Sequence, residues 1–435
     1  MLFIIVAPSI YLLGSILVIV GVVCLGSSFV LLNSFLPLLA ANHPSITNTR
    51  TAGTSTTSPD EDDEHDDINE SHPYKQQQDV KAASPALALS TKISSYGVGL
   101  GYLAAVFMQV ISILLLISLN KFTTFSSGST PLRLVLFFVG LWWALFSIPT
   151  SLWLRDRAGP PLPSTNINTS PSLLKQTLTY TAFAWRSVYR TLRLALQLRD
   201  LSLFLLAWFL LSDAIATVSG TAILFARTEL GMSTVPIALL SITVTTSGIL
   251  GAFVWPILSR RYNLRTHSTI IACVCLMQTI PIYGLIGYLP PIKALGWGGL
   301  QQPWEIYPLG VVYGFVMGGL SSYCRSFYGQ LIPPGSEAAF YALYAITDKG
   351  SSAVGPAITG YIVDRVGSIR PAFAFLAVLI AAPVPFVWVL KPERGRKDAL
   401  AMAERLKGGE ERGERAGLRE EDGEVALGLL NRNRE

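Results

Sequence analysis

Residues 201–226 read LSLFLLAWFLLSDAIATVSGTAILFA, a run in which Asp213 is the only charged side chain. A helix that crosses about 30 Å of hydrocarbon needs about 20 mostly apolar residues, so this run predicts a membrane span. Eight more windows have the same character: 10–39, 94–119, 132–154, 236–258, 268–290, 305–324, 338–363 and 370–390. We therefore expect an all-α polytopic membrane protein with nine transmembrane helices.

The composition of the chain agrees with a lipid environment. Of the 435 residues, 51% are hydrophobic and 14% are charged, whereas soluble domains carry about 25% charged residues. The apolar windows are too long and too uniform for the tilted strands of a membrane β-barrel. Helices are therefore the expected way for this backbone to satisfy its hydrogen bonds in lipid.

The distribution of Lys and Arg predicts the orientation of the chain, because cytosolic loops carry the excess of basic residues. If the segment 41–93 is cytosolic, the cytosolic segments hold 26 basic residues and the opposite side holds six. The C-terminus is then cytosolic. Nine helices would leave the N-terminus on the far side, whereas three further helices before Met1 would place both ends in the cytosol.

Twelve helices in two halves of six, joined by a long basic loop, are the plan of the major facilitator superfamily. On this plan, residues 1–154 are the remnant of an N-terminal bundle, 155–200 form a cytosolic central loop, and 201–390 form a complete C-terminal six-helix bundle. Two segments are too polar to bury a core, and we expect disorder there. They are the acidic loop 44–92 and the cytosolic tail 391–435, in which the one expected element is a short helix around 398–408.

Charged residues inside the predicted spans are candidates for function, because each costs about 2.5–3.5 kcal/mol at a helix centre. Asp213 lies in the middle of its span, and Asp348 and Lys349 lie in the middle of 338–363. An amino-acid ammonium group could meet either carboxylate, and a substrate carboxylate could meet Lys349. The alternative is that Asp348 and Lys349 form pairs that only hold helices together.

Three polar residues extend this candidate site for substrate binding or coupling. Tyr344 and Ser352 lie four residues to either side of Asp348, so the three share one face of a helix. Gln278 lies inside the span 268–290 and could contact substrate or bond to a neighbouring helix.

A second group of residues suggests gating or a helix latch. The dipeptide Gly355-Pro356 lacks one backbone donor, which favours an interruption like those of transporter helices, or else a plain packing bend. The stretch GYIVDRVGSIR, which ends at Arg370, resembles a helix-latch pattern of major facilitators and contains Asp364 and Arg365. There the carboxylate and the arginines would join adjacent helix ends.

The sequence offers no catalytic or metal-binding pattern. The four cysteines fall in or at the ends of apolar windows without CxxC spacing. The four histidines lie in or beside loops, and the chain contains no GxSxG motif. We expect no enzyme activity, no cofactor, no bound metal and no nucleic-acid partner.

Several motifs occur in an order that resembles one known family. Residues 323–356 read YCRSFYGQLIPPGSEAAFYALYAITDKGSSAVGP. Earlier motifs are SFVLLNSFLPLL at 28–39, ISSYGVGLGY at 93–102 and GPPLP at 159–163. Together they resemble the autophagy-related protein 22 family, the vacuolar amino-acid effluxers of fungi. The resemblance covers nearly all of residues 10–397.

This resemblance implies a function that hydropathy and charge do not reveal. It implies release of leucine and other neutral amino acids from the vacuole to the cytosol after autophagic degradation. The chain would be a multi-pass protein of the vacuole membrane, in contact with the lipid bilayer, with protons as an open coupling ion. The family has twelve helices, and the segment around Asn33 matches the fourth, so the chain would lack the first three.

Three alternatives stay open from the sequence. The chain could be a major facilitator for another small solute, or an inactive truncated fragment. A membrane lipid hydrolase is a remote alternative, because the sequence offers no Ser, His and Asp constellation.

Overall fold

The computed structural model describes residues 2–5, 11–44, 73–122, 130–153, 173–406 and 408. Over these residues the elements are helices joined by turns, with no strand. Within these described ranges, seven helical segments are long and apolar enough to cross a membrane. They lie in α1 (Tyr11–Ala41), α3 (Pro73–Phe122), α4 (Thr130–Trp153), α6 (Arg199–Thr228), α7 (Thr234–Arg261), the pair α8 (Thr266–Met277) and α9 (Thr279–Ile286), and the pair α14 (Ala372–Ala381) and α15 (Pro383–Val389).

These seven segments confirm a helical membrane protein. The two other predicted windows, 305–324 and 338–363, are also helical but do not meet the same measure of length and apolarity. The first lies in α11 (Ile306–Leu331), which is rich in Gly, Ser and Tyr. The second is divided between α12 (Glu337–Ser351) and α13 (Val354–Val366). The count of nine spans and the facilitator arrangement therefore stay predictions.

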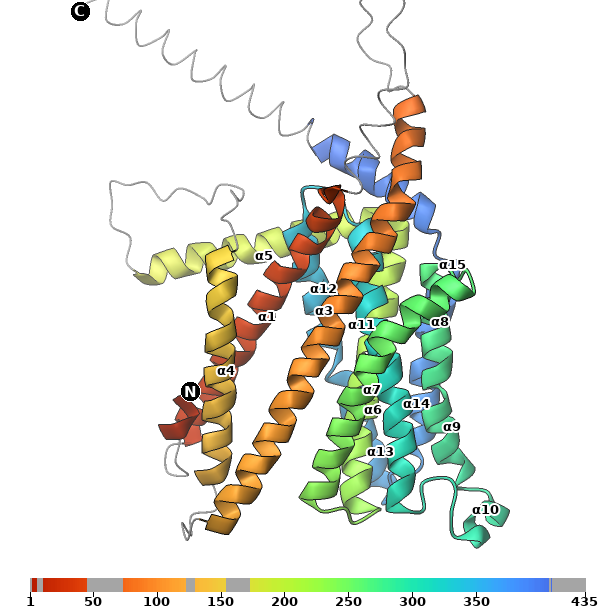
Figure 1. Cartoon of the computed structure of the whole chain (residues 1–435). Helices are drawn as coiled ribbons and strands as arrows, with labels where there is room; N and C mark the ends of the chain where they lie inside the picture. The colour runs from red at the N-terminus through yellow and green to blue at the C-terminus, as the bar shows by residue number, and fades with distance from the viewer. Residues whose placement is uncertain are drawn as a thin grey trace, which may run out of the picture.

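The helices from α6 onward form one closely packed bundle, as Figure 1 shows. Helices α1, α3 and α4 lie to one side of it, and α3 packs along α7 and α11. One end of the bundle carries α5 (Leu173–Gln197), and the opposite end carries the short helix α10 (Pro290–Leu295). We refer to these as the α5 end and the α10 end. The 3-10 helices are η1 (Leu2–Ile5) and η3 (Pro303–Glu305), which directly precedes α11.

Glycines let α7 and α11 approach until their backbones touch. A Cβ atom added at Gly314 would lie 2.0 Å from the carbonyl oxygen of Val244, and one at Gly318 would lie 2.2 Å from that of Gly248. No larger residue fits without moving a helix. This contact explains the GxxxG spacing of Gly314 and Gly318 as close helix packing, the usual role of small residues between membrane helices.

Three segments that the sequence suggests to be loop or disordered contain helix. Part of the predicted loop 155–200 is the amphipathic helix α5. The predicted disorder of 44–92 is wrong from residue 73, where α3 begins, and the acidic run lies outside the described residues. In the tail 391–435, the short helix expected around 398–408 is present but begins earlier, at 392, and runs to 406, so the predicted disorder is wrong over 392–397. Residues 407 and 409–435 lie outside the described residues.

The physical reason is that net polarity does not prevent a helix that has a surface to pack on or a span to extend. Residues 73–87 continue the helix of an apolar span, and this stretch is rich in Gln and Ala, which favour helix. In the helix over 392–406, which we call the post-span helix, Ala399, Met402 and Ala403 are buried. A narrow apolar stripe therefore docks an otherwise charged segment.

Candidate functional site

The candidate site is built around an interruption in the helix that joins the two ends of the bundle. Helix α12 has 15 residues and ends at Ser351, and α13 has 13 residues and begins at Val354. Each is too short to cross about 30 Å alone. Pro356 lies in the first turn of α13, where a missing backbone N–H costs little. The sequence therefore ends one helix and starts another inside the bundle.

Helix α6 binds both sides of this interruption through two consecutive residues. Ser212 donates its hydroxyl to the carbonyl oxygen of Asp348 at 3.0 Å and also contacts the Asp348 carboxylate. Asp213 is 4% exposed, and its Oδ1 accepts the backbone N–H of Gly355 at 2.9 Å. A carboxylate at a helix N-terminus is stabilised by the free N–H groups and the helix dipole. We call Ser212 and Asp213 the α6 clamp.

Gly355 is required at this point because the two helices touch there. A Cβ atom added to Gly355 would lie 2.0 Å from Oγ1 of Thr217, and 3.0 and 3.1 Å from the Asp213 carboxylate oxygens. The Thr217 hydroxyl donates to the Asp213 carbonyl oxygen at 2.6 Å, so it is fixed in place. Asp213 and Gly355, 142 residues apart in the chain, are thus brought into direct contact.

Asp348 and Lys349 form an ion pair at the end of α12. Lys349 Nζ lies 3.0 Å from Oδ2 of Asp348, and the side chains are 77% and 27% exposed. Asp348 is also held by Ser212, whereas most of the Lys349 side chain is exposed. An exposed pair of this kind is weak, so its members can exchange partners at low cost.

Tyr344 and Ser352 have local roles. Tyr344 is buried and stacks on Trp208 of α6, with ring centroids 4.6 Å apart, and packs against Tyr328 at 4.9 Å. Such aromatic pairs stabilise helix contacts by about 0.5–1.5 kcal/mol beyond their buried area. Ser352 donates to the carbonyl oxygen of Lys349 at 3.0 Å and is half-buried at the interruption. Tyr344 therefore supports α12 against α6 from within the core.

Gln278 lies at the junction of α8 and α9, on a different pair of helices. Its Nε2 donates to the carbonyl oxygen of Ala377 in α14 at 2.9 Å. Its Oε1 is buried without a partner among the described residues. Gln278 thus joins α14 to a kink in the span 268–290, and its contacts do not connect it to the α6 clamp.

The candidate latch residues Asp364, Arg365 and Arg370 do not form one cluster. Asp364 and Arg365 are exposed at the end of α13, and the Arg365 guanidinium lies 5.4 Å from the ring centre of Tyr361. Arg370 instead reaches the loop before η3, donating to the carbonyl oxygens of Gly299 at 3.3 Å and Leu300 at 3.4 Å. The arginine thus joins a helix end to a backbone loop.

Glu305, which sequence reasoning missed, organises that same loop at the α10 end. Its carboxylate is 1% exposed and accepts four hydrogen bonds, from the Tyr283 hydroxyl at 2.9 Å and from the backbone N–H groups of Gly298, Leu300 and Gln302 at 3.1, 2.8 and 2.9 Å. Burial raises the pKa of the Glu305 carboxyl, but these hydrogen bonds outweigh it and hold the pKa below its usual value.

Asp200 is the corresponding buried carboxylate at the α5 end, and it was also missed. Arg394 donates Nε to Oδ2 at 2.7 Å and Nη2 to Oδ1 at 2.8 Å, and the Lys391 N–H donates to Oδ1 at 3.1 Å. The hydrogen bonds that Arg394 donates to the Asp200 carboxylate raise the pKa of the Arg394 guanidinium. The pair attaches the post-span helix to the start of α6.

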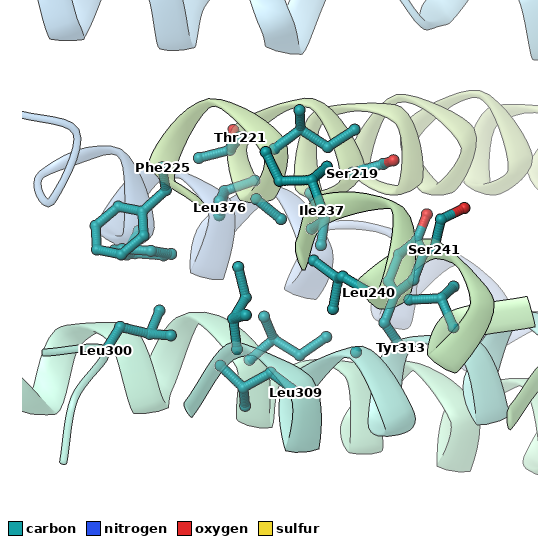
Figure 2. Close-up of a pocket in the computed structure, with 18 residues that line it drawn as sticks. Ser219, Thr221, Phe225, Ile237, Leu240, Ser241, Leu300, Leu309, Tyr313 and Leu376 are labelled. Carbon is teal, nitrogen blue, oxygen red and sulfur yellow. The ribbon is translucent and has the colours of Figure 1, made fainter. Parts of the chain in front are cut away.

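A mostly apolar cavity of about 170 Å³ lies between α6, α7, α9, α11 and α14. Figure 2 shows side chains such as Ile237, Leu240 and Leu376 around it. Its few polar neighbours are hydroxyls, among them those of Ser241 and Tyr313. Its chemistry suits an uncharged aliphatic group and offers no partner for a charge.

Comparison with known proteins places the chain in a family. Residues 1–400 match the family described as "Vacuole effluxer Atg22 like". The chain belongs to this family. "Autophagy-related protein 22-1" of Sclerotinia sclerotiorum is 56% identical over 416 residues, which cover 94% of this chain and 69% of that protein. "Autophagy-related protein 22-2" of Neosartorya fischeri is 53% identical over 450 residues, which cover 100% and 73%.

Membership of the Atg22-like family confirms the resemblance seen in the sequence motifs. The family is one of vacuole effluxers, and its relatives are named for autophagy rather than for a catalysed reaction. With seven membrane-length helical segments among its described residues, the chain is a vacuolar membrane protein of this family and not an enzyme. The lipid hydrolase alternative is therefore not supported.

Proposed function

We propose that this Atg22-like chain exports neutral amino acids, leucine among them, from the vacuole to the cytosol. The observation that carries the proposal is the interrupted helix α12–α13, which α6 holds open beside the Asp348–Lys349 ion pair. An interrupted helix that exposes charged groups inside a bundle is the form that transporter binding sites take.

The two charges of the ion pair match the two charges of an amino acid. The Lys349 amine is available to a substrate carboxylate, and the Asp348 carboxylate to a substrate ammonium group. Because the pair is partly exposed, substrate can replace each partner without leaving a buried charge. Asp213 is different, because it is buried and already accepts the backbone N–H of Gly355. We therefore assign to Asp213 the role of positioning the interruption.

The apolar cavity further along α6 is evidence that the substrates have uncharged side chains. Its lining includes Val218, Ala222 and Phe225 from the same helix that carries the α6 clamp. An aliphatic side chain gains free energy from such walls, whereas a charged side chain would lose its hydration without compensation. This preference favours leucine over lysine or glutamate.

We further propose the architecture that the basic residues indicate. Residues 201–390 would form one six-helix half of a major facilitator, and 1–154 would belong to the other half. The segments 155–200 and 391–435 would be cytosolic, and protons are the proposed coupling ion. In sealed vacuoles, tags in both cytosolic segments should be open to added protease; protection of either tag would contradict this orientation.

The functional test compares Asp348→Asn and Lys349→Met in vacuoles from fungal cells that lack their own amino-acid effluxers. Vacuoles loaded with labelled leucine should lose it in the presence of the unmodified chain and retain it with either variant. Protein abundance should stay near the unmodified level, because neither change strands a fully buried charge. Glu393→Gln and Lys397→Met remove exposed charges outside the spans and serve as matched controls.

The same vacuoles discriminate the alternatives. Normal leucine efflux in both site variants would end the assignment of this ion pair as the binding site. Loss of both variants from the membrane would favour the purely structural role of the pair. Release of another loaded solute, but not of leucine, by the unmodified chain would show a facilitator of different specificity.

A further inference from the structure

Helix α5 has exposed apolar and basic faces that contacts within the chain do not explain. It connects α4, which ends at Trp153, to α6, which begins at Arg199. Both neighbours contain membrane-length segments. In Figure 1, α4 ends and α6 begins at the α5 end. Figure 1 shows α5 running across the α5 end, roughly perpendicular to the bundle helices. The helix therefore lies at the level where these two membrane-length helices end and begin.

One narrow face of α5 packs on the protein. Thr191 and Ala195 are buried, and they lie four residues apart on one side of the helix. The helices against which α5 packs most extensively are α6 and α12, which carry the α6 clamp and the ion pair. The fully buried positions lie in the C-terminal half of α5, whereas no residue of 175–190 is fully buried.

A second face of α5 is apolar and uncovered. Leu178, Trp185, Tyr189 and Leu196 follow one another at intervals of seven, four and seven, which places them on one stripe. Their exposed fractions are between 66% and 71%. A continuous stripe of large apolar side chains in water is unusual and marks a surface that meets a membrane or a partner.

A third face of α5 is basic. Lys175, Arg186, Arg190 and Arg193 are exposed and lie along one edge of the apolar stripe. The sequence of α5 contains no acidic residue to balance them. Apolar side chains bordered by Lys and Arg are the pattern of helices that lie in the surface of a bilayer and bind anionic lipids.

We propose that α5 lies in the membrane surface, with its apolar stripe among the acyl chains and its basic edge bound to anionic lipid headgroups. The preceding membrane-length helix also ends in exposed apolar side chains, since Leu152 and Trp153 at the end of α4 are 75% and 82% exposed. Charge complementarity selects lipid phosphates over an uncharged partner. Through Thr191 and Ala195, the lipid surface then fixes the start of α6.

The depth of the stripe can be measured with a fluorophore on single cysteines in a full-length chain without its native cysteines. In liposomes of phosphatidylcholine and phosphatidylserine, labels introduced by Trp185→Cys and Tyr189→Cys should be quenched strongly by lipids brominated on their acyl chains. A label from Thr179→Cys, on the exposed polar side of α5, should be quenched several-fold less. Equal, weak quenching at all three positions would show that protein covers the stripe, and would overturn the proposal.

The basic edge is tested by energy transfer from the label at position 189 to headgroup-labelled lipids. Transfer to phosphatidylserine should exceed transfer to phosphatidylcholine at equal density. Replacing Arg186, Arg190 and Arg193 by Gln should remove this preference, whereas replacing them by Lys should keep it. A preference that survives the Gln changes, or that is absent in the unmodified chain, would refute anionic lipid binding. Neither measurement depends on leucine transport.

Discussion

Replacing Gly355 by Ala tests whether the α6 clamp holds the interrupted helix. A methyl group at this position would lie 2.0 Å from Oγ1 of Thr217, whereas ordinary contacts begin near 3.4 Å. The start of α13 must therefore move from α6 by about 1.4 Å, or Thr217 must rotate. Such a movement lengthens the Gly355 N–H to Asp213 hydrogen bond, now 2.9 Å, beyond bonding distance.

The cost of this change follows from which bond is lost. If α13 moves, the buried Asp213 carboxylate loses a donor, which costs about 1–3 kcal/mol. If Thr217 rotates instead, its 2.6 Å hydrogen bond to the Asp213 carbonyl oxygen is lost, at a cost of about 0.5–1.5 kcal/mol. Either path destabilises the clamp, so we expect a lower Tm of the purified protein and slower leucine efflux.

A matched control lies on the same helix. A Cβ atom added at Gly360 would meet nothing within 4 Å, and Ala favours helix over Gly by about 1 kcal/mol. Gly360→Ala should therefore leave Tm and efflux unchanged or slightly raised. Adding Thr217→Ala to Gly355→Ala should restore part of the loss, because the nearest obstacle to the methyl group is removed.

The measurement is thermal unfolding in detergent together with efflux from loaded vacuoles. If Gly355→Ala behaved like Gly360→Ala in both assays, the close contact between α6 and α13 would have no energetic weight. If Thr217→Ala worsened the defect, the hydroxyl would be supporting the clamp rather than obstructing the methyl group. Both outcomes would refute the reasoning from this contact.

Three further predictions concern contacts outside the clamp. Glu305→Gln should lower Tm by the same amount at every pH above 4.5, the usual pKa of a Glu carboxyl. Only the ionised carboxyl gains from its four donors, so the Tm difference between variant and unmodified protein should vanish as the pH falls through the lower pKa that Glu305 has in the folded protein. Gly314→Ala should destabilise the protein by about 1–3 kcal/mol by separating α11 from α7, whereas Gly220→Ala, with nothing within 4 Å, should not. Arg394→Met should leave the Asp200 carboxylate unpaired and expose the post-span helix to protease, and adding Asp200→Asn should restore part of the protection.

Much of the fold could be predicted because lipid imposes a simple rule on sequence. A helix in hydrocarbon must be long and apolar, so windows such as 201–226 are visible without knowledge of any contact. The interruption before Pro356 follows from backbone chemistry in the same way. The partner of that interruption could not be predicted, because the contact of Asp213 with Gly355 depends on how two distant helices pack.

Helices outside the lipid follow weaker rules, and here prediction fell short. The segment 155–200 contains Pro, Ser and many basic residues, so its average composition is polar. This average hides the stripe of Leu178, Trp185 and Tyr189 inside the segment. The post-span helix is predicted only in part, from about 398, because its many charges conceal the small apolar face that includes Ala399. Periodicity within a polar segment, rather than its composition, carries the signal for such helices.

The two buried carboxylates that sequence reasoning missed each lie at the start of a helix, and this placement explains why they were missed. Asp200 lies at the first turn of α6, and Glu305 directly precedes α11. At the end of a span a charge is expected in water, so hydropathy gives no reason to examine it. Each becomes buried only because another segment folds back over the helix end: the post-span helix for Asp200 and the loop at Gly298 for Glu305. A charged residue at a helix end is therefore informative only once the donors that surround it are known. In this chain both carboxylates have such donors, and they fasten the bundle at its two opposite ends.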